Sequence, residues 1–269
     1  MSEGFSADWL DLREPYDAAA CSSFLRDHLV AWCHGRETLR IVDLGAGTGA
    51  QLRRLSPRLG TGQHWILVEH DPALIAAGGA RLAAVGVSWR YRCLDLARDL
   101  EALATERADL IAASALIDLV AAPWLGRLLA LRAAAGAALY LTLCYDGRMV
   151  WEPADPGDAE IAALVDRHQR TDKGFGPALG PEAAASVREA LAGLPGELLT
   201  ERSDWRLGEG DAAIQTALLA GYLEAAAAIA APAARRRIAA WGERRARLVA
   251  SRRSRLTVGH LDLLFLPPG

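Results

Sequence analysis

Short apolar runs alternate with helix-like segments along the first half of the chain. Strands that alternate with helices form parallel sheets whose two faces are both covered. The run at 137–144 is almost entirely apolar, as a doubly covered strand should be. We therefore expect a parallel sheet that includes strands at residues 40–44, 64–69, 91–96, 109–114 and 137–144.

Helix signals separate these runs. A first core helix is expected over 51–59, directly after a group of glycines. Pro72 is typical of the first turn of a helix, Asp71 is the expected N-cap, and Gly86 is expected to end this second helix. Before the first strand, an amphipathic helix is expected over about 16–32, where it would cover one edge of the sheet.

The second half of the chain departs from this alternation. Proline, glycine and aspartate are dense over 151–181, with one helix possible over 158–168, and a loop-rich stretch of this length is usually functional. Its segment 170–176 holds the only lysine of the chain and an aromatic residue, so we interpret it as a lid over the substrate; a mobile surface loop is the alternative. The remaining expected elements are a helix at 181–194, strands at 198–205 and 259–266, and between these strands two helices broken near Pro232.

The length of 269 residues suits one large α/β domain with additions. The predicted fold is a doubly wound, mostly parallel, seven-stranded sheet with an N-terminal helical lid and helical cap insertions. We divide the chain into an N-terminal lid or helix, a Rossmann-like core, a lid loop with the sixth strand, and a helical cap with the last strand, at residues 1–39, 40–145, 146–210 and 211–269.

Composition narrows the class of protein. With 52% hydrophobic and 23% charged residues, the chain can bury a large core. No run approaches the roughly 18 uncharged apolar residues of a membrane span, and the first residues lack a secretory pattern, so we expect a cytoplasmic protein without membrane contact. The four cysteines are scattered without a C-x-x-C pair, so we expect them to be reduced and expect no metal site.

One segment carries a strong local charge. Residues 235–255 hold nine arginines against one glutamate, a balance of +8 in a chain of net charge −3, which leaves −11 for the rest. Clustered arginine can mark a nucleic-acid footprint. Ile238, Trp241 and Leu248 give the same helix an apolar stripe, so we favour arginines that pair with an acidic core or an acidic substrate.

The stretch 40–50 carries the clearest chemistry. It combines an apolar strand, Asp43 and three alternate glycines in the pattern G-x-G-x-G. A dinucleotide site has G-x-G-x-x-G and receives a pyrophosphate, which the carboxylate of Asp43 would repel, and no Walker Gly-Lys-Ser/Thr is present. Asp43 would suit a ligand with an ammonium and a sulfonium, so the loop favours S-adenosylmethionine (SAM) over NAD. The alternative is a glycine-rich turn without a ligand.

These residues resemble the class I SAM-dependent methyltransferases, and the resemblance extends over residues 40–145. In that family an acidic residue at the second strand end binds both ribose hydroxyls, which implies this role for Glu69. An aspartate after the third strand lies near the adenine amino group, which implies Asp95. SAM is thus the implied cofactor and S-adenosylhomocysteine (SAH) the product. The implied cofactor-binding residues in this range are Asp43, Gly45, Ala46, Gly47, Glu69, His70, Asp95, Leu96 and Ser114.

His70, Ser114 and Asp118 are expected at or just after the ends of strands. His70 directly follows the second strand and would lie beside the adenine or ribose; an exposed loop histidine is the alternative. Ser114 and Asp118 lie in the loop that surrounds the sulfonium region in the resembled family, so both are expected to face the reacting centre. The alternative for Asp118 is a carboxylate that stabilises the N-terminus of the next helix.

Two more candidates follow the fifth strand. Tyr145 and Asp146 lie in the polar cluster 145–148, at the sheet edge where open α/β sheets bind ligands. They are the candidates for a general base or an orienting pair. A simple β-turn around Asp-Gly is the alternative.

The segment 9–17 resembles the N-terminal lid of many small-molecule methyltransferases. An arginine in such a lid can pair with the methionine carboxylate of SAM, and Arg13 is the candidate. A solvated surface arginine is the alternative.

The leading functional hypothesis is a SAM-dependent methyltransferase that acts on O, N or C of a small molecule. The absence of an Asn/Asp-Pro-Pro-Tyr/Phe motif after the fourth strand argues against amino methylation of nucleobases or glutamine. The alternative is an alkyl transferase or cyclase that acts on the aminobutyrate chain of SAM and releases methylthioadenosine. A SAM-binding or nucleic-acid-binding module is disfavoured, and the sequence leaves open whether the chain forms an oligomer.

Overall fold

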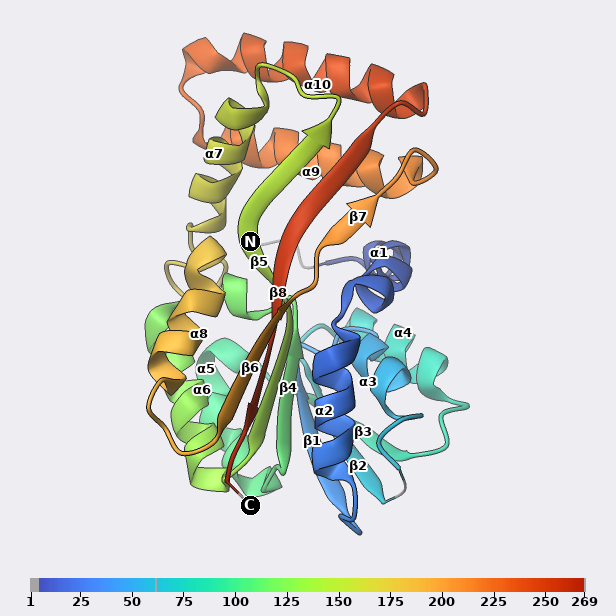
Figure 1. Cartoon of the computed structure of the whole chain (residues 1–269), viewed down its shortest axis with the longest axis vertical. Helices are drawn as coiled ribbons and strands as arrows, with labels where there is room; N and C mark the ends of the chain where they lie inside the picture. The colour runs from blue at the N-terminus through green and yellow to red at the C-terminus, as the bar shows by residue number, and fades with distance from the viewer. Residues whose placement is uncertain (1–4, 61, 269) are drawn as a thin grey trace.

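A mixed sheet of eight strands forms the centre of the molecule (Figure 1). The computed structural model describes residues 5–60 and 62–268. The strands are β1 (Leu39–Leu44), β2 (Gln63–Glu69), β3 (Ser88–Cys93), β4 (Leu110–Ser114), β5 (Ala138–Glu152), β6 (Glu197–Arg202), β7 (Trp205–Leu207) and β8 (Arg255–Leu266). Their order is β3-β2-β1-β4-β5-β8-β6, and β7 also pairs with β8. Pairs among β1 to β5 are parallel, whereas β8 is antiparallel to its three neighbours.

Helices cover both faces of the sheet (Figure 1). On one face lie α2 (Ser23–Cys33), α3 (Ala50–Leu55) and α4 (Pro72–Leu82). On the other lie α5 (Leu96–Asp99), α6 (Ala122–Ala135) and α8 (Ala183–Leu191), with the short 3₁₀ helices η1 (Leu100–Glu106), η2 (Ile117–Leu119) and η3 (Gly180–Glu182).

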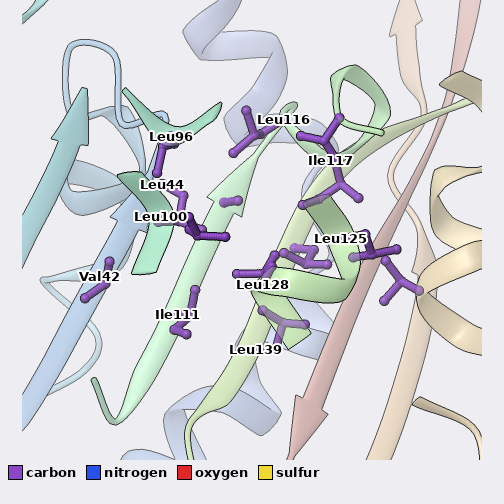
Figure 2. Close-up of a cluster of buried hydrophobic side chains, with 14 of the residues drawn as sticks. Val42, Leu44, Leu96, Leu100, Ile111, Leu116, Ile117, Leu125, Leu128 and Leu139 are labelled. Carbon is purple, nitrogen blue, oxygen red and sulfur yellow. The ribbon is translucent and has the colours of Figure 1, made fainter. Parts of the chain in front are cut away.

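Successive side chains of each strand point to opposite faces of the sheet, so the strands contribute to two hydrophobic cores. In β1, Ile41 packs toward α2 and α3, whereas Val42 and Leu44 pack toward α5 and α6. Figure 2 shows the second of these clusters, in which Leu96, Leu125 and other side chains converge on the strands. This arrangement confirms the predicted doubly wound α/β fold, with eight strands in place of the seven expected.

A helical cap stands on an extension of two strands. β5 and β8 continue together beyond the rest of the sheet toward α7 (Asp158–Gln169), α9 (Ala212–Ile229), η4 (Pro232–Ala234) and α10 (Arg235–Ala250) (Figure 1). A third core, formed by residues such as Trp151, Ile161 and Trp241, joins these elements. The predicted pair of helices broken near Pro232 is confirmed.

The fifth strand is longer than predicted. It was expected to end at Cys144, with Tyr145 and Asp146 beyond its end in the polar cluster 145–148, but β5 runs on to Glu152. β8 supplies backbone partners along this extension, and irregularities between Leu141 and Cys144 and between Tyr145 and Met149 absorb the Asp-Gly sequence. The predicted strand end at Cys144 is therefore wrong, and so is the alternative of a simple β-turn at Asp146-Gly147.

Other boundaries differ for local reasons. The single helix expected over 16–32 is two helices, α1 (Ala7–Ala20) and α2, because Ser22 caps α2 through Leu25 N and its own backbone N–H donates to Asp262 at 2.8 Å. The strand expected at 198–205 is divided into β6 and β7. Asp71 caps α4 as predicted, but that helix ends at Leu82, before Gly86.

The arginine-rich segment forms α10 and packs against acidic residues near the start of α7. Arg237 pairs with Glu160 at 2.7 Å, and Arg244 pairs with Asp155 at 2.6 Å. Three of the nine arginines thus join α7, the third being the fully buried Arg245. Arg255, which follows α10, pairs with Glu209 at 3.1 Å, so the prediction that these arginines pair with acidic residues of the chain is confirmed for four of the nine.

The described residues include one apolar helix of membrane-spanning length and no cluster of metal-ligating side chains. Within the described residues, α9 is the one helix with the length and apolar composition of a membrane span, with a mean hydropathy of 1.4, and 28% of its residues are buried. The described ranges contain no cluster of three or more His, Cys, Asp or Glu side chains suited to a metal ion, and the four cysteines are free.

Candidate active site

A cavity of about 610 Å³ lies at the carboxyl ends of β1, β2, β3 and β4. It is lined by the glycine loop, the ends of the strands, one side of α1 and residues 173–175. Cofactor and substrate pockets have volumes of this order and occur at this edge of α/β sheets. The structure brings together on this lining all ten residues that were expected to bind the cofactor: Arg13, Asp43, Gly45, Ala46, Gly47, Glu69, His70, Asp95, Leu96 and Ser114.

The glycine loop needs its glycines. Gly45, Gly47 and Gly49 have φ values of 63°, 52° and 81°, in the left-handed region that side chains disfavour. A Cβ at Gly47 would lie 2.9 Å from Leu10 Cδ1 on α1, and one at Gly49 would lie 2.7 Å from Leu82 Cδ1. The loop therefore brings backbone close to the cavity while α1 and α4 pack against it.

Asp43, near the end of β1, has one carboxylate oxygen without a hydrogen-bond partner among the described residues. The residue is only 1% exposed, and its Oδ1 accepts a hydrogen bond from Gln51 Nε2 at 3.0 Å. Its Oδ2 has no partner among the described residues. Burial raises the pKa of this carboxyl to about 7, against the opposing effect of Arg54. A buried carboxylate of this kind favours a cationic donor in the cavity.

Glu69 is held rigidly at the tip of β2. Its Oε1 accepts hydrogen bonds from the backbone N–H groups of His70 at 2.8 Å and Asp71 at 3.0 Å. Its Oε2 accepts from Gly47 N at 3.0 Å, so the carboxylate joins the strand tip to the glycine loop. The His70 ring is exposed, with Nδ1 3.1 Å from Glu69 Oε1.

The far end of the cavity is apolar with a polar rim. Asp95 caps α5 through Ala97 N at 2.9 Å and leaves its carboxylate half-exposed, and Leu96 beside it is buried. The Trp124 indole donates to Leu96 O at 2.7 Å and meets the Phe175 ring edge-on at 5.5 Å. This end can therefore hold a flat, partly polar ring.

α1 forms the roof of the cavity through polar contacts. None of its residues is fully buried. Glu14 receives two hydrogen bonds from Arg53, at 3.0 and 2.5 Å, and Tyr16 donates to Asp211 at 2.9 Å. Trp9, Leu12 and Tyr16 also pack against the core of the cap, so α1 is held by both polar and apolar contacts.

Arg13 is already paired within this roof. Its Nε and Nη2 donate to the two carboxylate oxygens of Asp17 at 2.8 and 3.1 Å, and its guanidinium lies 5.0 Å from the centre of the Trp205 ring. Arg54, which the sequence analysis missed, also lines the cavity and donates only to the neutral Oε1 of Gln51, at 3.2 Å. In the described part of the chain no carboxylate oxygen lies within 4.0 Å of the Arg54 guanidinium.

The three catalytic candidates lie outside the cavity lining. Asp118 is buried with Oδ1 unpaired, and burial raises its pKa to about 6. The Tyr145 hydroxyl donates to Asp166 at 3.1 Å, and burial raises its pKa. Asp146 accepts from Arg148 Nε at 2.7 Å within β5. The structure therefore does not bring these three side chains to the cavity with the ten cofactor candidates.

His260 on β8 is a buried histidine whose pKa is lowered in the folded protein. The ring is 6% exposed, packs 5.3 Å from the centre of the Trp205 ring, and has no partner at Nδ1 within the described residues. Burial lowers its pKa to about 3, helped by the nearby Arg13. The folded state thus keeps His260 neutral where the unfolded chain protonates it.

The free energy of unfolding should therefore fall as the pH drops. The contribution of His260 is fully present above its unfolded pKa near 6.5 and is lost toward pH 3, at about 1.4 kcal/mol per pH unit. A His260→Phe variant should show a shallower loss between pH 6 and 4 in urea titrations. His64→Phe, at an exposed position, is the matched control and should follow the wild type; equal slopes for all three proteins would contradict this assignment.

No protein-family model matches the chain, and a search of curated proteins finds no match. Solved structures do match. A cyclopropane-fatty-acyl-phospholipid synthase-like protein from Lactobacillus casei is 12% identical, with a TM-score of 0.51 over 98% of this chain and 95% of that one. The YcgJ protein from Bacillus subtilis is 12% identical, with a TM-score of 0.50 over 92% and 100%.

A SAM-dependent methyltransferase from Geobacter sulfurreducens, solved with SAH, is 14% identical over all of both chains, with a TM-score of 0.47. At such identities structural similarity establishes the fold and not the activity. The strand order and the similarity to the Lactobacillus casei and Bacillus subtilis structures establish a doubly wound α/β fold, as the resemblance to class I methyltransferases implied.

Proposed function

We propose that the protein binds SAM in the cavity and transfers its methyl group to a small molecule. The unpaired, buried Oδ2 of Asp43 carries this proposal, because it lies beside a glycine loop with no basic Walker residue. The residues present fit the cofactor. Asp43 would bind its ammonium, Glu69 its ribose hydroxyls and Arg54 its carboxylate, while Leu96 and Asp95 would hold the adenine.

The assignment of Arg54 replaces the earlier candidate Arg13. A carboxylate that entered the cavity would have to displace Asp17 from Arg13, whereas Arg54 has only a neutral acceptor to give up. Arg54 lies in the same network as Asp43, because Gln51 contacts both side chains. The two charges of an amino-acid moiety would thus be recognised by Asp43 at the end of β1 and by Arg54 on α3.

When bound, SAM supplies a methyl group on a positively charged sulfur, which needs little covalent help from the protein. The protein has to hold the acceptor in line and exclude water, and α1 and residues 173–175 cover the cavity for this purpose. For a hydroxyl or amine acceptor, we assign proton removal to Asp17. Its carboxylate lines the cavity, is oriented by Arg13 and Trp205, and has a pKa that burial raises.

The titration of Asp43 gives a first test. With a pKa of about 7, this carboxyl is about 90% ionised at pH 8 and about 10% at pH 6, so the affinity for SAH should fall about tenfold over this range. Isothermal titration calorimetry at both pH values measures the change. An Asp43→Asn variant should bind SAH weakly and show little pH dependence; a wild-type affinity independent of pH would contradict the role of Asp43.

Product analysis tests the reaction. The protein is incubated with SAM and pools of small acceptors, and SAH and methylthioadenosine are measured by mass spectrometry. Acceptor-dependent SAH supports methyl transfer. Methylthioadenosine would indicate attack at another carbon of the sulfonium, and neither product, together with tight SAM binding, would indicate a binding module.

A further inference from the structure

Some cationic side chains on the cavity wall have a carboxylate partner, and others do not. Arg13 pairs with Asp17 and Arg53 pairs with Glu14, so these four side chains are mutually neutralised. Asp71 and Asp95 cap helices. Two cations on the lining remain without a carboxylate within 4.0 Å in the described ranges, namely Arg54 and Lys173. A single cofactor carboxylate can satisfy only one of them.

Lys173 is the only lysine of the chain, and its ammonium has neutral neighbours. Nζ lies 3.3 Å from His168 Nδ1 and 3.1 Å from Thr171 Oγ1. Burial lowers the pKa of Lys173, and the pKa of His168 is lowered by burial and by Lys173 itself. A partly desolvated ammonium with only neutral partners gains strongly from an anion.

Asp172 precedes Lys173 in the segment 170–176, but its carboxylate is bound to the loop backbone and does not pair with the Lys173 ammonium. Asp172 Oδ1 accepts the backbone N–H groups of Gly174 at 2.7 Å and Gly176 at 2.9 Å. This arrangement turns the Asp172 carboxylate toward the loop backbone and leaves Lys173 and Phe175 on the cavity wall. Leu116 and Leu119 continue the wall as an apolar surface.

We propose that the acceptor substrate is a small anion with an apolar body, and that Lys173 binds its carboxylate or phosphate while Phe175 and the leucines contact the body. This inference rests on the proposed function, because it assigns Arg54 to the cofactor. It makes Lys173 a specificity-determining residue and excludes neutral acceptors of the same shape. A lysine is suited to this role, since an ammonium binds either anion as a point charge.

The test uses protein saturated with SAH and three probes that share one ring: benzoate, phenyl phosphate and benzamide. Ligand-observed NMR titration should detect saturable binding of at least one anion, at least tenfold tighter than benzamide. Lys173→Met should weaken that binding at least tenfold, and Lys173→Arg should restore most of it. Arg188→Met removes an exposed charge on α8 and should have no effect.

The SAH affinity of each variant, measured by calorimetry, distinguishes a loss of acceptor binding from a loss of cofactor binding. It should stay within about twofold of wild type for all three variants. Equal binding of benzoate and benzamide, undiminished anion binding by Lys173→Met, or no binding of either anion to the SAH complex would overturn the inference. Failure of the wild type to bind SAH would instead overturn the proposed function.

Discussion

Replacing Glu69 with alanine is expected to weaken SAH binding about 100-fold. The carboxylate accepts three backbone N–H groups that join the tip of β2 to the glycine loop, so it is positioned before a ligand arrives. Loss of charge-assisted hydrogen bonds to the two ribose hydroxyls costs about 3 kcal/mol, which corresponds to this factor. Calorimetry with SAH measures the loss directly.

A matched control distinguishes recognition from general damage. Glu106 is also an ion-paired carboxylate, bound to Arg90 and Arg92, but it lies outside the cavity. Glu106→Ala should therefore bind SAH as the wild type does. If Glu69→Ala retained wild-type affinity while remaining folded by circular dichroism, the sugar contact would be misassigned.

The largest loss of stability is expected from Arg245→Ala. The guanidinium is fully buried in the cap, donates to Asp158 at 2.6 and 2.5 Å and to Pro153 O at 2.6 Å, and lies 5.3 Å from the centre of the Trp151 ring. Its removal leaves Pro153 O without this donor and a gap beside Trp151, whereas Asp158 is 20% exposed and keeps Trp241 Nε1 as a donor. A loss of about 3 kcal/mol is therefore expected. Urea unfolding followed by tryptophan fluorescence measures the change.

Arg247→Ala is the control for the same helix. Arg247 is exposed on α10, two positions from Arg245, and its substitution should change the free energy of unfolding by less than about 0.5 kcal/mol. Similar small effects of both variants would mean that the buried pair contributes nothing to the cap. If the Arg245→Ala variant is folded but no longer binds SAH, the structure of the cap contributes to binding in the cavity.

The core of the site was accessible from the sequence because its signals are local. A carboxylate before alternate glycines and an acid at the next strand end are fixed by the topology of successive parallel strands, which brings all carboxyl ends to one edge. Asp43, Gly47 and Glu69 therefore lie where they were expected, on one cavity wall. Such inferences need no knowledge of distant contacts.

Two of the three catalytic candidates, Tyr145 and Asp146, depended on a strand end at Cys144 that does not occur. Asp146-Gly147 has the composition of a turn, but β8 lies alongside and supplies backbone partners, so β5 continues through irregular pairing. Tyr145 and Asp146 are consequently bound to Asp166 and Arg148. A partner strand more than a hundred residues away cannot be read from local composition.

Some ion pairs can be predicted from sequence spacing, and others cannot. Arg13 and Asp17 are four positions apart on α1, a spacing that favours an ion pair once the segment is recognised as a helix. Arg54 had no such signal, because its lack of an acidic partner depends on which side chains α1 and the sheet bring near it. The partners of α10 lie about 80 positions earlier in the chain and were equally hidden.

The cavity is expected to recognise an adenosyl amino acid without phosphate. Calorimetric titration of the wild-type protein at pH 8 with SAH, NAD and ATP examines this specificity. We expect a saturable isotherm with SAH and no measurable heat of binding with NAD or ATP. Saturable binding of NAD or ATP, with none of SAH, would contradict it.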